Sequence, residues 1–490
     1  MDRLAYLLVI LSLISGVSPA ARAQTQTDSP PPNVLFILAD DLNTTLTSYG
    51  AKGVHTPNID RLAEMGLCFE RAYTQAPVCN PSRAALMTGK RTNSLGIWNN
   101  EPHFRGIFPR IITLPQAFKQ SGYHTIGIGK VFHNWAQAIQ GDPRSWSEPQ
   151  RYHWAPHYQD WYVPGKPYRI QQDLSKGPAV QRVAVEDEAY LDGRIANEAI
   201  QRLRELRGTP FFMAVGFWKP HLPYNAPARY WDLYDPDDLP EVRYSDRVRG
   251  VPELAYNDSD EAKSYTDVAR NQPIPEAKYR ELRHGYFACI SFLDAQIGKL
   301  LDELEALGLM ENTIVVFTSD HGYHAGEHGQ FGKWTHFEIG TRVPLFIAAP
   351  GADYVSSART TSLVEHVDLY PTLLELCGLA EKAELDGTSL VPILEDPSRT
   401  VKSYAYAQIA RPIGSVQRLA VVGSSVRSQD YRYTSWRDES TGKVLAEELY
   451  DLSQDLWNAK NLAQEAAWQS IRQQLADTLR VMTVDRTFDH

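Results

Sequence analysis

Cys79 opens a short run whose residue types and spacing can do chemistry. The run reads C-N-P-S-R, from Cys79 to Arg83, and continues to Gly89. Pro81 suits the first turn of a helix, where its missing N–H costs nothing, and glycine suits the end of a helix. We therefore expect Cys79 at a helix N-terminus, with Arg83 one turn further on the same face. A helix N-terminus and a guanidinium form an anion site, here beside a sulfur nucleophile.

Acidic side chains follow two apolar runs, at the point where a buried strand is expected to end. Asp40 and Asp41 directly follow the run NVLFILA, and Asp320 follows the run TIVVFT. Ligands collect beyond the carboxyl ends of strands in α/β sheets, so these carboxylates are expected to converge on one edge. Each pair alone could be a helix cap or a turn. Three clustered carboxylates would repel each other without a cation, and oxygen ligands favour Ca²⁺ before Mg²⁺.

Basic side chains also occur in segments that follow expected strands or the Asp320 motif. Lys130 and His133 lie in GKVFH after an expected strand, His221 lies in WKPHLP, and Lys333 lies in QFGKW. Lysine and histidine are common on surfaces, so each of them alone indicates little. Their positions, at strand ends or just after the Asp320 motif, predict a positive pocket near the acidic edge. Lys219, next to His221, is expected to be solvated or to face a substrate.

Fully apolar strands alternate with helices over most of the chain, which predicts a doubly wound, mostly parallel α/β sheet flanked by helices. After about residue 400 the strands become shorter and more alternating, which predicts a small antiparallel sheet closed by a helix. The expected strands are 33–39, 124–128, 211–217, 313–318, 343–349, 404–409, 419–422, 431–436 and 445–450. The expected helices are 57–65, 79–88, 114–121, 188–207, 278–307, 368–377 and 466–482.

The run C-x-P-S-R followed by T-G resembles the signature of type I sulfatases, and the resemblance extends from Asp40 to the segment ELYDL near residue 450. It implies an alkaline-phosphatase-like fold and the oxidation of Cys79 to formylglycine, whose hydrated aldehyde is the nucleophile. It also implies a divalent cation. The implied metal ligands are Asp40, Asp41, Cys79, Asp320 and His321. His321 departs from the Asn that many relatives carry, but an imidazole nitrogen can replace an amide oxygen.

The resemblance assigns roles to the basic residues as well. The implied catalytic residues are Cys79, Arg83, Lys130, His133, His221 and Lys333. Lys130 and Lys333 would stabilise charge on the sulfate oxygens. His221 or Lys333 would protonate the leaving oxygen, Asp320 would accept a proton from the nucleophile, and His133 would assist the expulsion of sulfate.

Among sulfatases, the motifs GKVFH, KPHLP and DHG…GEHG are most similar to those of the iduronate-2-sulfatases. The resemblance implies a sulfated carbohydrate as substrate, such as a polysaccharide or glycosaminoglycan-type fragment, and a maturation enzyme that generates formylglycine. His324, Glu327 and His328 of the motif HAGEHG are interpreted as structural or cleft-lining.

Two alternatives stay open. The first is a phosphomonoesterase or phosphodiesterase of the same superfold, which would bind two transition metals. Ligands for a second metal are not obvious in this sequence, and Lys130 and Lys333 take the role of a second cation. The second alternative is an inactive carbohydrate-binding relative, which would require a gap among these residues.

Composition limits the partners. The 490 residues carry 49 Lys and Arg against 59 Asp and Glu, a formal net charge of −10. This balance argues against nucleic acid or an anionic membrane as partner, so an anionic substrate must be attracted by a local basic pocket. Cys68, Cys289 and Cys377 are expected to be buried small hydrophobic residues and not a disulfide framework.

The first 23 residues are typical of a secretory signal peptide, with a short apolar segment and small residues before the expected cleavage site. Residues 24–32 are expected to be a flexible leader, residues 33–395 a catalytic domain, and residues 396–490 a C-terminal α+β subdomain. The protein is therefore expected to be exported, either periplasmic or secreted. The apolar segment is short for a membrane span.

One segment, at 140–170, is rich in aromatic residues among Pro, Gly and Gln. It is interpreted either as a packed loop or as the aromatic wall of a binding cleft for sugars. Its aromatic residues are Trp146, Tyr152, Trp154, Tyr158, Trp161 and Tyr162.

Overall fold

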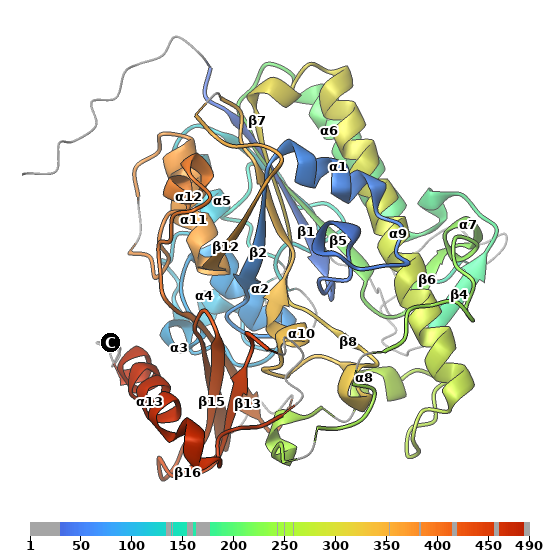
Figure 1. The fold of residues 1–490 in the computed structure, drawn as a ribbon. Coiled ribbons are helices and arrows are strands. Elements are labelled where there is room, and N and C mark those ends of the chain that lie inside the picture. The colour runs from blue at the N-terminus through green and yellow to red at the C-terminus, as the bar shows by residue number, and fades with distance from the viewer. Residues whose placement is uncertain are drawn as a thin grey trace, which may run out of the picture. The chain divides into compact units, whose positions relative to one another are not determined.

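The main sheet of the protein has eight strands in the order β10-β2-β11-β7-β1-β5-β3, with β12 paired to β2 (Figure 1). The structure is a computed structural model that describes residues 30–133, 139, 141–153, 160–162, 177–242, 244–248, 250–257, 259–351, 353–381, 384–413, 419–454 and 460–484. The expected signal peptide, most of the leader, Trp154 and Tyr158 lie outside the described residues.

The strands of the main sheet are β1 (Asn33–Asp40), β2 (Leu67–Tyr73), β3 (His124–Gly129), β5 (Phe211–Pro220), β7 (Thr313–Ser319), β10 (Arg342–Val343), β11 (Leu345–Ala348) and β12 (Ala358–Glu365). The pairs β1–β5, β1–β7, β3–β5 and β2–β12 are parallel. β11 runs antiparallel to both β7 and β2. The sheet is therefore mixed and mostly parallel, as the apolar runs predicted.

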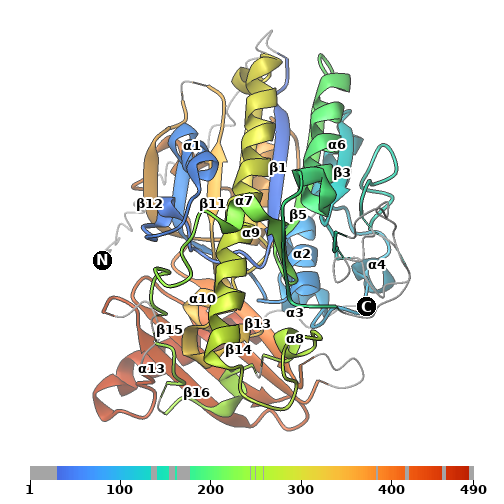
Figure 2. The ribbon, with the colours of Figure 1, turned by 90° about the vertical axis from the view of Figure 1, so that its right-hand side faces the viewer.

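Helices cover both faces of this sheet (Figures 1 and 2). The longer helices are α1 (Pro57–Met65), α2 (Cys79–Thr88), α5 (Leu114–Gln120), α6 (Leu191–Glu205), α9 (Glu276–Ala306), α11 (Leu369–Leu376), α12 (Val391–Glu395) and α13 (Gln469–Val484). Leu35 and Ile37 of β1 pack in one core with α1, α6 and α9, whereas Val34 and Phe36 pack in the other with α2, α5 and α11. Alternate β1 side chains thus face opposite helical layers.

The second sheet is antiparallel, in the order β13-β14-β15-β16, with α13 packed against it. Its strands are β13 (Ala405–Arg411), β14 (Val421–Arg427), β15 (Tyr431–Asp438) and β16 (Val444–Asp451). The predicted small sheet and its helix are confirmed. The predicted strand at 419–422 is shifted, because β14 begins at Val421. The boundary at 395/396 stays a prediction.

Short elements complete the fold. They are the strand pairs β4 (Val180–Val183) with β6 (Tyr224–Pro227) and β8 (His324–Ala325) with β9 (Phe331–Gly332), and the helices α3 (Thr92–Leu95), α4 (Phe104–Ile107), α7 (Ala228–Trp231), α8 (Asp260–Lys263) and α10 (Glu338–Thr341). The cysteines at 68, 289 and 377 are free and buried, as expected. Among the described residues, no helix combines the length and apolar content needed to cross a bilayer.

Candidate active site

Helix α2 carries the cysteine run as predicted. Cys79 is its first residue, Arg83 follows one turn later, and Gly89 ends the helix with φ 67°, in the left-handed region that favours glycine. The whole helix is buried. Ser82, between Cys79 and Arg83, donates to the main-chain carbonyl of Asp320, which ties the start of α2 to the end of β7.

The acidic residues converge at the carboxyl edge of the main sheet. Asp40 ends β1 and Asp320 follows β7, its parallel neighbour. The main-chain N–H of Asp41 donates to Asp320 Oδ1 at 3.2 Å, so the two acidic pairs are in direct contact. Asp41 has φ 66°, an uncommon conformation for a non-glycine residue that is often found at functional sites.

Three groups surround the thiol of Cys79. His321 Nε2 lies 3.4 Å from its Sγ, Lys333 Nζ lies 3.5 Å away, and Asp40 Oδ1 lies 3.7 Å away. Burial raises the pKa of the Cys79 thiol well above its ordinary value, although Lys130 and Lys333 oppose this. The thiol is therefore protonated in this structure, which is unfavourable for direct attack by sulfur.

Each permanent cation of the site contacts at least one of the carboxylates. Lys333 Nζ lies 2.9 Å from Asp41 Oδ1, and Lys130 Nζ contacts Asp40. Arg83 Nε donates to Asp320 Oδ2 at 2.8 Å. The Lys130 ammonium also lies over the ring of Trp218, 5.0 Å from its centroid.

The positive charges dominate the titration of Asp40. Burial alone would raise its pKa, but the charges of Lys130, His221, Arg83 and Lys333 hold it well below the ordinary value. Asp40 is thus a carboxylate over the whole physiological range of pH.

His221 follows β5 and joins the site through Asp41, since its Nε2 lies 3.6 Å from Asp41 Oδ2. Lys219 does not have the predicted environment: its side chain is buried, and Nζ donates to the carbonyl of Pro223 at 2.7 Å and contacts Asn225. The expectation of a solvated or substrate-facing Lys219 is wrong. The ammonium instead holds together the turn that presents His221, because it also donates to the His221 carbonyl at 3.4 Å.

His133 is buried, and within the described part of the chain neither ring nitrogen has a hydrogen-bond partner. Burial lowers its pKa well below the ordinary value, and the neighbouring charges of Lys130 and Arg83 lower it further. The imidazole is therefore neutral in this structure. Buried unpaired nitrogens are costly and indicate a place for a ligand.

The residues present fit a divalent cation. Donor atoms of Asp40, Cys79, Asp320 and His321 all lie within 4.8 Å of one another, and all four residues are buried. A second group, which shares Cys79, adds Asp41 and His221. Across the site, four carboxylates face three permanent cations. The carboxylates are Asp40, Asp41, Glu261 and Asp320, and the cations are Arg83, Lys130 and Lys333. The excess negative charge and the oxygen ligands suit a hard divalent cation.

The structure also shows the environment of the motif HAGEHG. His324 is buried and bonds the Glu327 carbonyl at 3.0 Å and Thr335 Oγ1 at 2.7 Å. His328 packs on the ring of Phe337, with centroids 4.2 Å apart. These two histidines are structural, as interpreted from the sequence, and Glu327 lines the cavity described below.

Only part of the aromatic segment is described. Trp146 is buried, its ring packs edge-on against Phe132, and its Nε1 donates to Gln150 at 3.1 Å. For Trp146 the packing interpretation is therefore confirmed. Trp161 and Tyr162 are half-buried.

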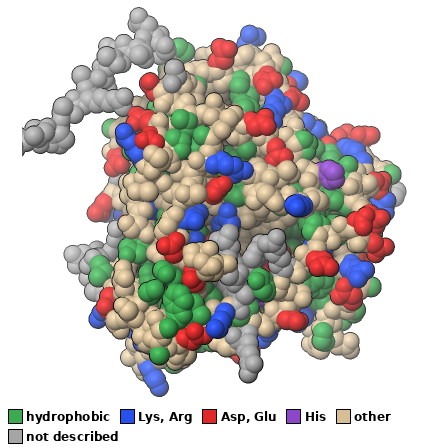
Figure 3. Space-filling model, viewed as in Figure 1, with side chains coloured by type: hydrophobic (Ala, Val, Ile, Leu, Met, Phe, Trp, Pro, Cys, Tyr) green, Lys and Arg blue, Asp and Glu red, His purple; other side chains and the backbone are tan. Residues whose placement is uncertain are grey.

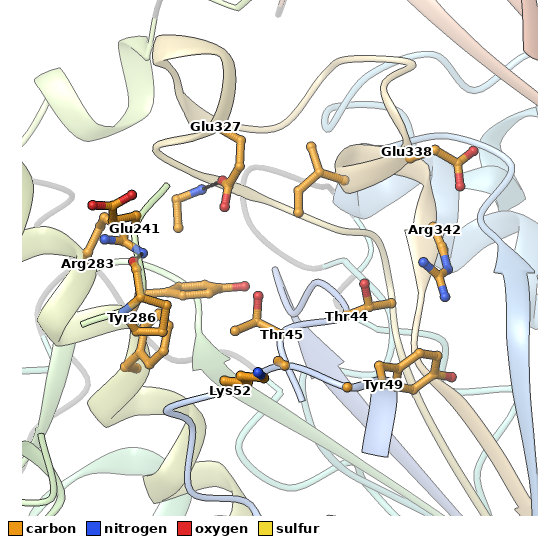
Figure 4. A pocket seen from close by; sticks show the side chains of 16 residues that line it. Thr44, Thr45, Tyr49, Lys52, Glu241, Arg283, Tyr286, Glu327, Glu338 and Arg342 are labelled. Carbon is orange, nitrogen blue, oxygen red and sulfur yellow. Dashed lines mark hydrogen bonds between the residues drawn. The ribbon is translucent and has the colours of Figure 1, made fainter. Parts of the chain in front are cut away.

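A cavity of about 580 Å³ lies beside α9, apart from the Cys79 cluster (Figure 4). Its walls come from the loop after β1, from α9 and from the segment before β10. Tyr286, which lines the cavity, donates from Oη to the Asp41 carbonyl at 2.9 Å. Basic and acidic side chains are interspersed on the face in Figure 3. The two lysines near Cys79 are buried, and each forms an ion pair with an aspartate.

One member of the site was missed by sequence reasoning. Glu261, on the four-residue helix α8, lies 3.1 Å from His221 Nε2 and 3.3 Å from Lys333 Nζ. No motif surrounds it, and only its place between two basic strand-end segments could have signalled it.

The comparisons with known proteins agree with this geometry. The chain matches the sulfatase family model over residues 32–379, and the model "N-sulphoglucosamine sulphohydrolase, C-terminal" over residues 326–485. Iduronate 2-sulfatase of Mus musculus is 32% identical over 513 residues, which cover 91% of each chain.

Two solved structures share the fold. One, determined in complex with its substrate D-glucosamine-2-N,6-O-disulfate, has a TM-score of 0.74 at 24% identity and covers 92% of this chain and 97% of its own. The phosphonate monoester hydrolase of Agrobacterium radiobacter has a TM-score of 0.73 at 22% identity, with 92% and 96% covered. The alkaline-phosphatase-like fold is thereby confirmed. With a family model over most of its length and a similar relative over nine tenths of it, the chain belongs to the sulfatase family and is a sulfuric ester hydrolase.

Proposed function

We propose that this sulfatase removes sulfate from a sulfated carbohydrate, with Cys79 converted to formylglycine beside a bound Ca²⁺ ion. The observation that carries the proposal is the convergence of a carboxylate, an imidazole and an ammonium group on one buried sulfur, at 3.4 to 3.7 Å. Those groups match the composition of a site that binds a cation and an anion together.

The substrate class is supported by the similarity to iduronate 2-sulfatase, which spans both chains almost completely. The motifs GKVFH and KPHLP, which carry Lys130, His133 and His221, lie within the matched region.

The formylglycine supplies an oxygen nucleophile in place of a thiol that burial keeps protonated. The cation, held by Asp40, Asp41, Asp320 and His321, supplies positive charge that stabilises oxyanions. Around them, the chain contributes fixed charges. The ammonium groups of Lys130 and Lys333 bind the sulfate oxygens in a buried environment, where such contacts are strong.

Arg83 orients the reacting residue from one turn further along α2, since its guanidinium contacts both Asp40 and Asp320. Both oxygens of Asp320 already accept hydrogen bonds, Oδ2 from Arg83 and Oδ1 from the main-chain N–H groups of Asp41 and His321. These bonds favour an Asp320 that is held in place as a hydrogen-bond acceptor, and not the proton-accepting role expected from the sequence.

Two residues handle protons at the ester. His221 or Lys333 donates a proton to the leaving sugar oxygen, because both carry N–H donors and both contact Asp41. His133, neutral and without a partner for its ring nitrogens among the described residues, accepts the proton that is released when sulfate leaves.

Export and maturation belong to the same proposal. The sequence of residues 1–23 supports secretion or a periplasmic location. A formylglycine-generating enzyme of the host would act on the C-x-P-S-R segment before this segment is buried, since α2 is fully enclosed in the folded chain.

The test is release of inorganic sulfate from a panel of defined sulfated oligosaccharides, with 4-nitrophenyl sulfate, 4-nitrophenyl phosphate and a phenyl phosphonate ester in parallel. We expect turnover of at least one sulfated sugar, and hydrolysis of the aryl sulfate faster than that of the aryl phosphate. Elemental analysis of the purified protein should find about one Ca²⁺ per chain. Preferred hydrolysis of the phosphate or phosphonate ester would contradict the proposal, because phosphonate hydrolases share this fold.

A further inference from the structure

The carboxylate of Glu261 contacts two basic groups of the site at once. Its Oε1 lies 3.1 Å from His221 Nε2, and its Oε2 lies 3.3 Å from Lys333 Nζ. The side chain is 19% exposed, whereas those of His221 and Lys333 are only 3% and 4% exposed. Glu261 thus forms the outer edge of an otherwise enclosed cluster.

The segment before Glu261 is fixed to the loop that carries Lys333. Asn257 Nδ2 donates to the Lys333 carbonyl at 2.7 Å, and the Asn257 N–H donates to Gln330 Oε1 at 2.6 Å. Ser259 Oγ accepts from the Phe331 N–H at 2.8 Å. These bonds link Asn257 and Ser259, which precede α8, to residues 330–333, so the start of α8 is held next to Lys333.

Asp41 contacts the same two basic groups, at 3.6 Å from His221 and 2.9 Å from Lys333. In the proposed function Asp41 is a ligand of the cation, and an oxygen that binds a cation is a weaker acceptor for other donors. Glu261 lies outside both groups of candidate metal ligands. It can therefore hold His221 and Lys333 while the cation is bound.

We propose that Glu261 is a positioning residue of the sulfatase reaction: its carboxylate aligns the His221 ring and the Lys333 ammonium for their work on the sulfate ester. The inference rests on the proposed function. Loss of such an alignment lowers turnover without removing the sulfate-binding charges, so kcat should change much more than KM.

The experiment compares kcat and KM of the wild type and Glu261→Gln on 4-nitrophenyl sulfate and phenyl sulfate. Glutamine keeps the shape but replaces one accepting oxygen with a donor, so kcat should fall about 10- to 100-fold. The fall should be larger for phenyl sulfate, because its poorer leaving group depends more on a proton donor. Neither ester carries a hydroxyl, so a lost contact to a sugar hydroxyl would leave both rates unchanged.

Two further variants separate alignment from folding. Glu261→Asp keeps the charge and should recover part of kcat, whereas Asp260→Asn, at the exposed neighbouring acid of α8, should leave both substrates unaffected. Equal losses on the two esters together with a lowered melting temperature would indicate a structural role and overturn the proposal. A wild-type kcat in Glu261→Gln on an active wild-type background would overturn it as well. A wild type that cleaves no sulfate ester would overturn both this inference and the proposed function.

Discussion

Two buried clusters of charged side chains serve this fold in different ways. One surrounds Cys79 at the carboxyl edge of the main sheet. The other surrounds Glu338 of α10, where Arg427 and Arg432 reach in from the small sheet and contact Glu338 Oε1. Tyr73 of β2 donates to the other oxygen, Oε2, at 3.1 Å. This second cluster links the main sheet, α10 and the small sheet.

The two clusters differ in how their charges are matched. Glu338 is one carboxylate between two guanidinium groups, and both of its oxygens are bonded. The Cys79 cluster instead has more carboxylates than permanent cations and contains His133, whose ring nitrogens have no partner within the described residues. A single acid held between two guanidinium groups suits a structural role, whereas several carboxylates gathered beside an unpartnered histidine suit the binding of ligands.

The largest expected effect is a loss of turnover from a substitution in the Cys79 cluster. Cys79→Ala should lower sulfate-ester turnover by at least about 10⁴-fold, because it removes the nucleophile. The melting temperature should stay close to that of the wild type, since alanine suits a helix and the Cys79 side chain is small. Initial rates on 4-nitrophenyl sulfate and thermal unfolding measure the two effects. Retained turnover in this variant would remove Cys79 from the mechanism.

The structural cluster should show the opposite pattern. Glu338→Gln leaves Arg427 and Arg432 buried without their counter-charge, so the free energy of unfolding should fall by about 3–5 kcal/mol. The kcat of the folded fraction should be unchanged. Asp302→Asn, which breaks a surface ion pair with Arg61, is the control and should cost less than about 1 kcal/mol. Urea titration gives the free energy of unfolding of the wild type and of both variants. Equal losses in Glu338→Gln and Asp302→Asn would show that the buried cluster contributes no more to stability than the surface ion pair.

Lysine removal at the catalytic cluster should affect the rate more than the stability, because Asp40 keeps Arg83 as a counter-charge when Lys130 is removed. Lys130→Ala removes a charge proposed to bind sulfate, and kcat should fall about 10²–10³-fold. That loss corresponds to about 3–4 kcal/mol of transition-state stabilisation. Steady-state kinetics and a melting curve of the same sample provide the readout. Normal turnover in this variant would show that the role assigned to Lys130 is wrong.

The pH dependence of stability provides a finer test of the structural cluster. Burial alone would raise the pKa of Glu338, but Arg432 and Arg427 lower it from the ordinary 4.5 to about 2. A lowered folded-state pKa stabilises the protein above the unfolded-state pKa, and this contribution is lost as the pH falls through the folded-state value. It amounts to about 3 kcal/mol at neutral pH.

The measurement is the difference in unfolding free energy between the wild type and Glu338→Gln, followed from pH 7 downward. This difference should be constant above about pH 5 and should shrink as the pH approaches about 2. Comparison with the variant cancels the titration of the other carboxylates. A difference that stays constant into acid would show that the Glu338 charge contributes little.

Sequence reasoning succeeded where local pattern decides structure. The runs NVLFILA, FFMAVGF and TIVVFT became β1, β5 and β7, and the predicted helix at 57–65 is α1 without a shift. Because parallel strands end at one edge of a sheet, the sequence alone predicts that the residues following them lie close together. Asp40, Lys130, His221 and Asp320 were found in this way.

The strands and the site residue that sequence reasoning missed depend on tertiary structure. β2 contains Glu70 and Arg71 and lacks a continuous apolar run, so its place between β10 and β11 could not be read from the sequence. The antiparallel direction of β11 is a property of the connection and not of its residues. Helices of four residues, such as α8, form only within a folded context, so Glu261 had no local signal.

The central claim, that Cys79 acts as an aldehyde within a ligand-binding cluster, is tested most directly by peptide mass analysis and sulfate release on the same preparations. Samples made with and without a formylglycine-generating enzyme would differ in the fraction of chains that carry the aldehyde at residue 79. The account predicts that turnover rises in proportion to that fraction and is absent at zero conversion. Full turnover in a preparation where every Cys79 peptide keeps its thiol would contradict it.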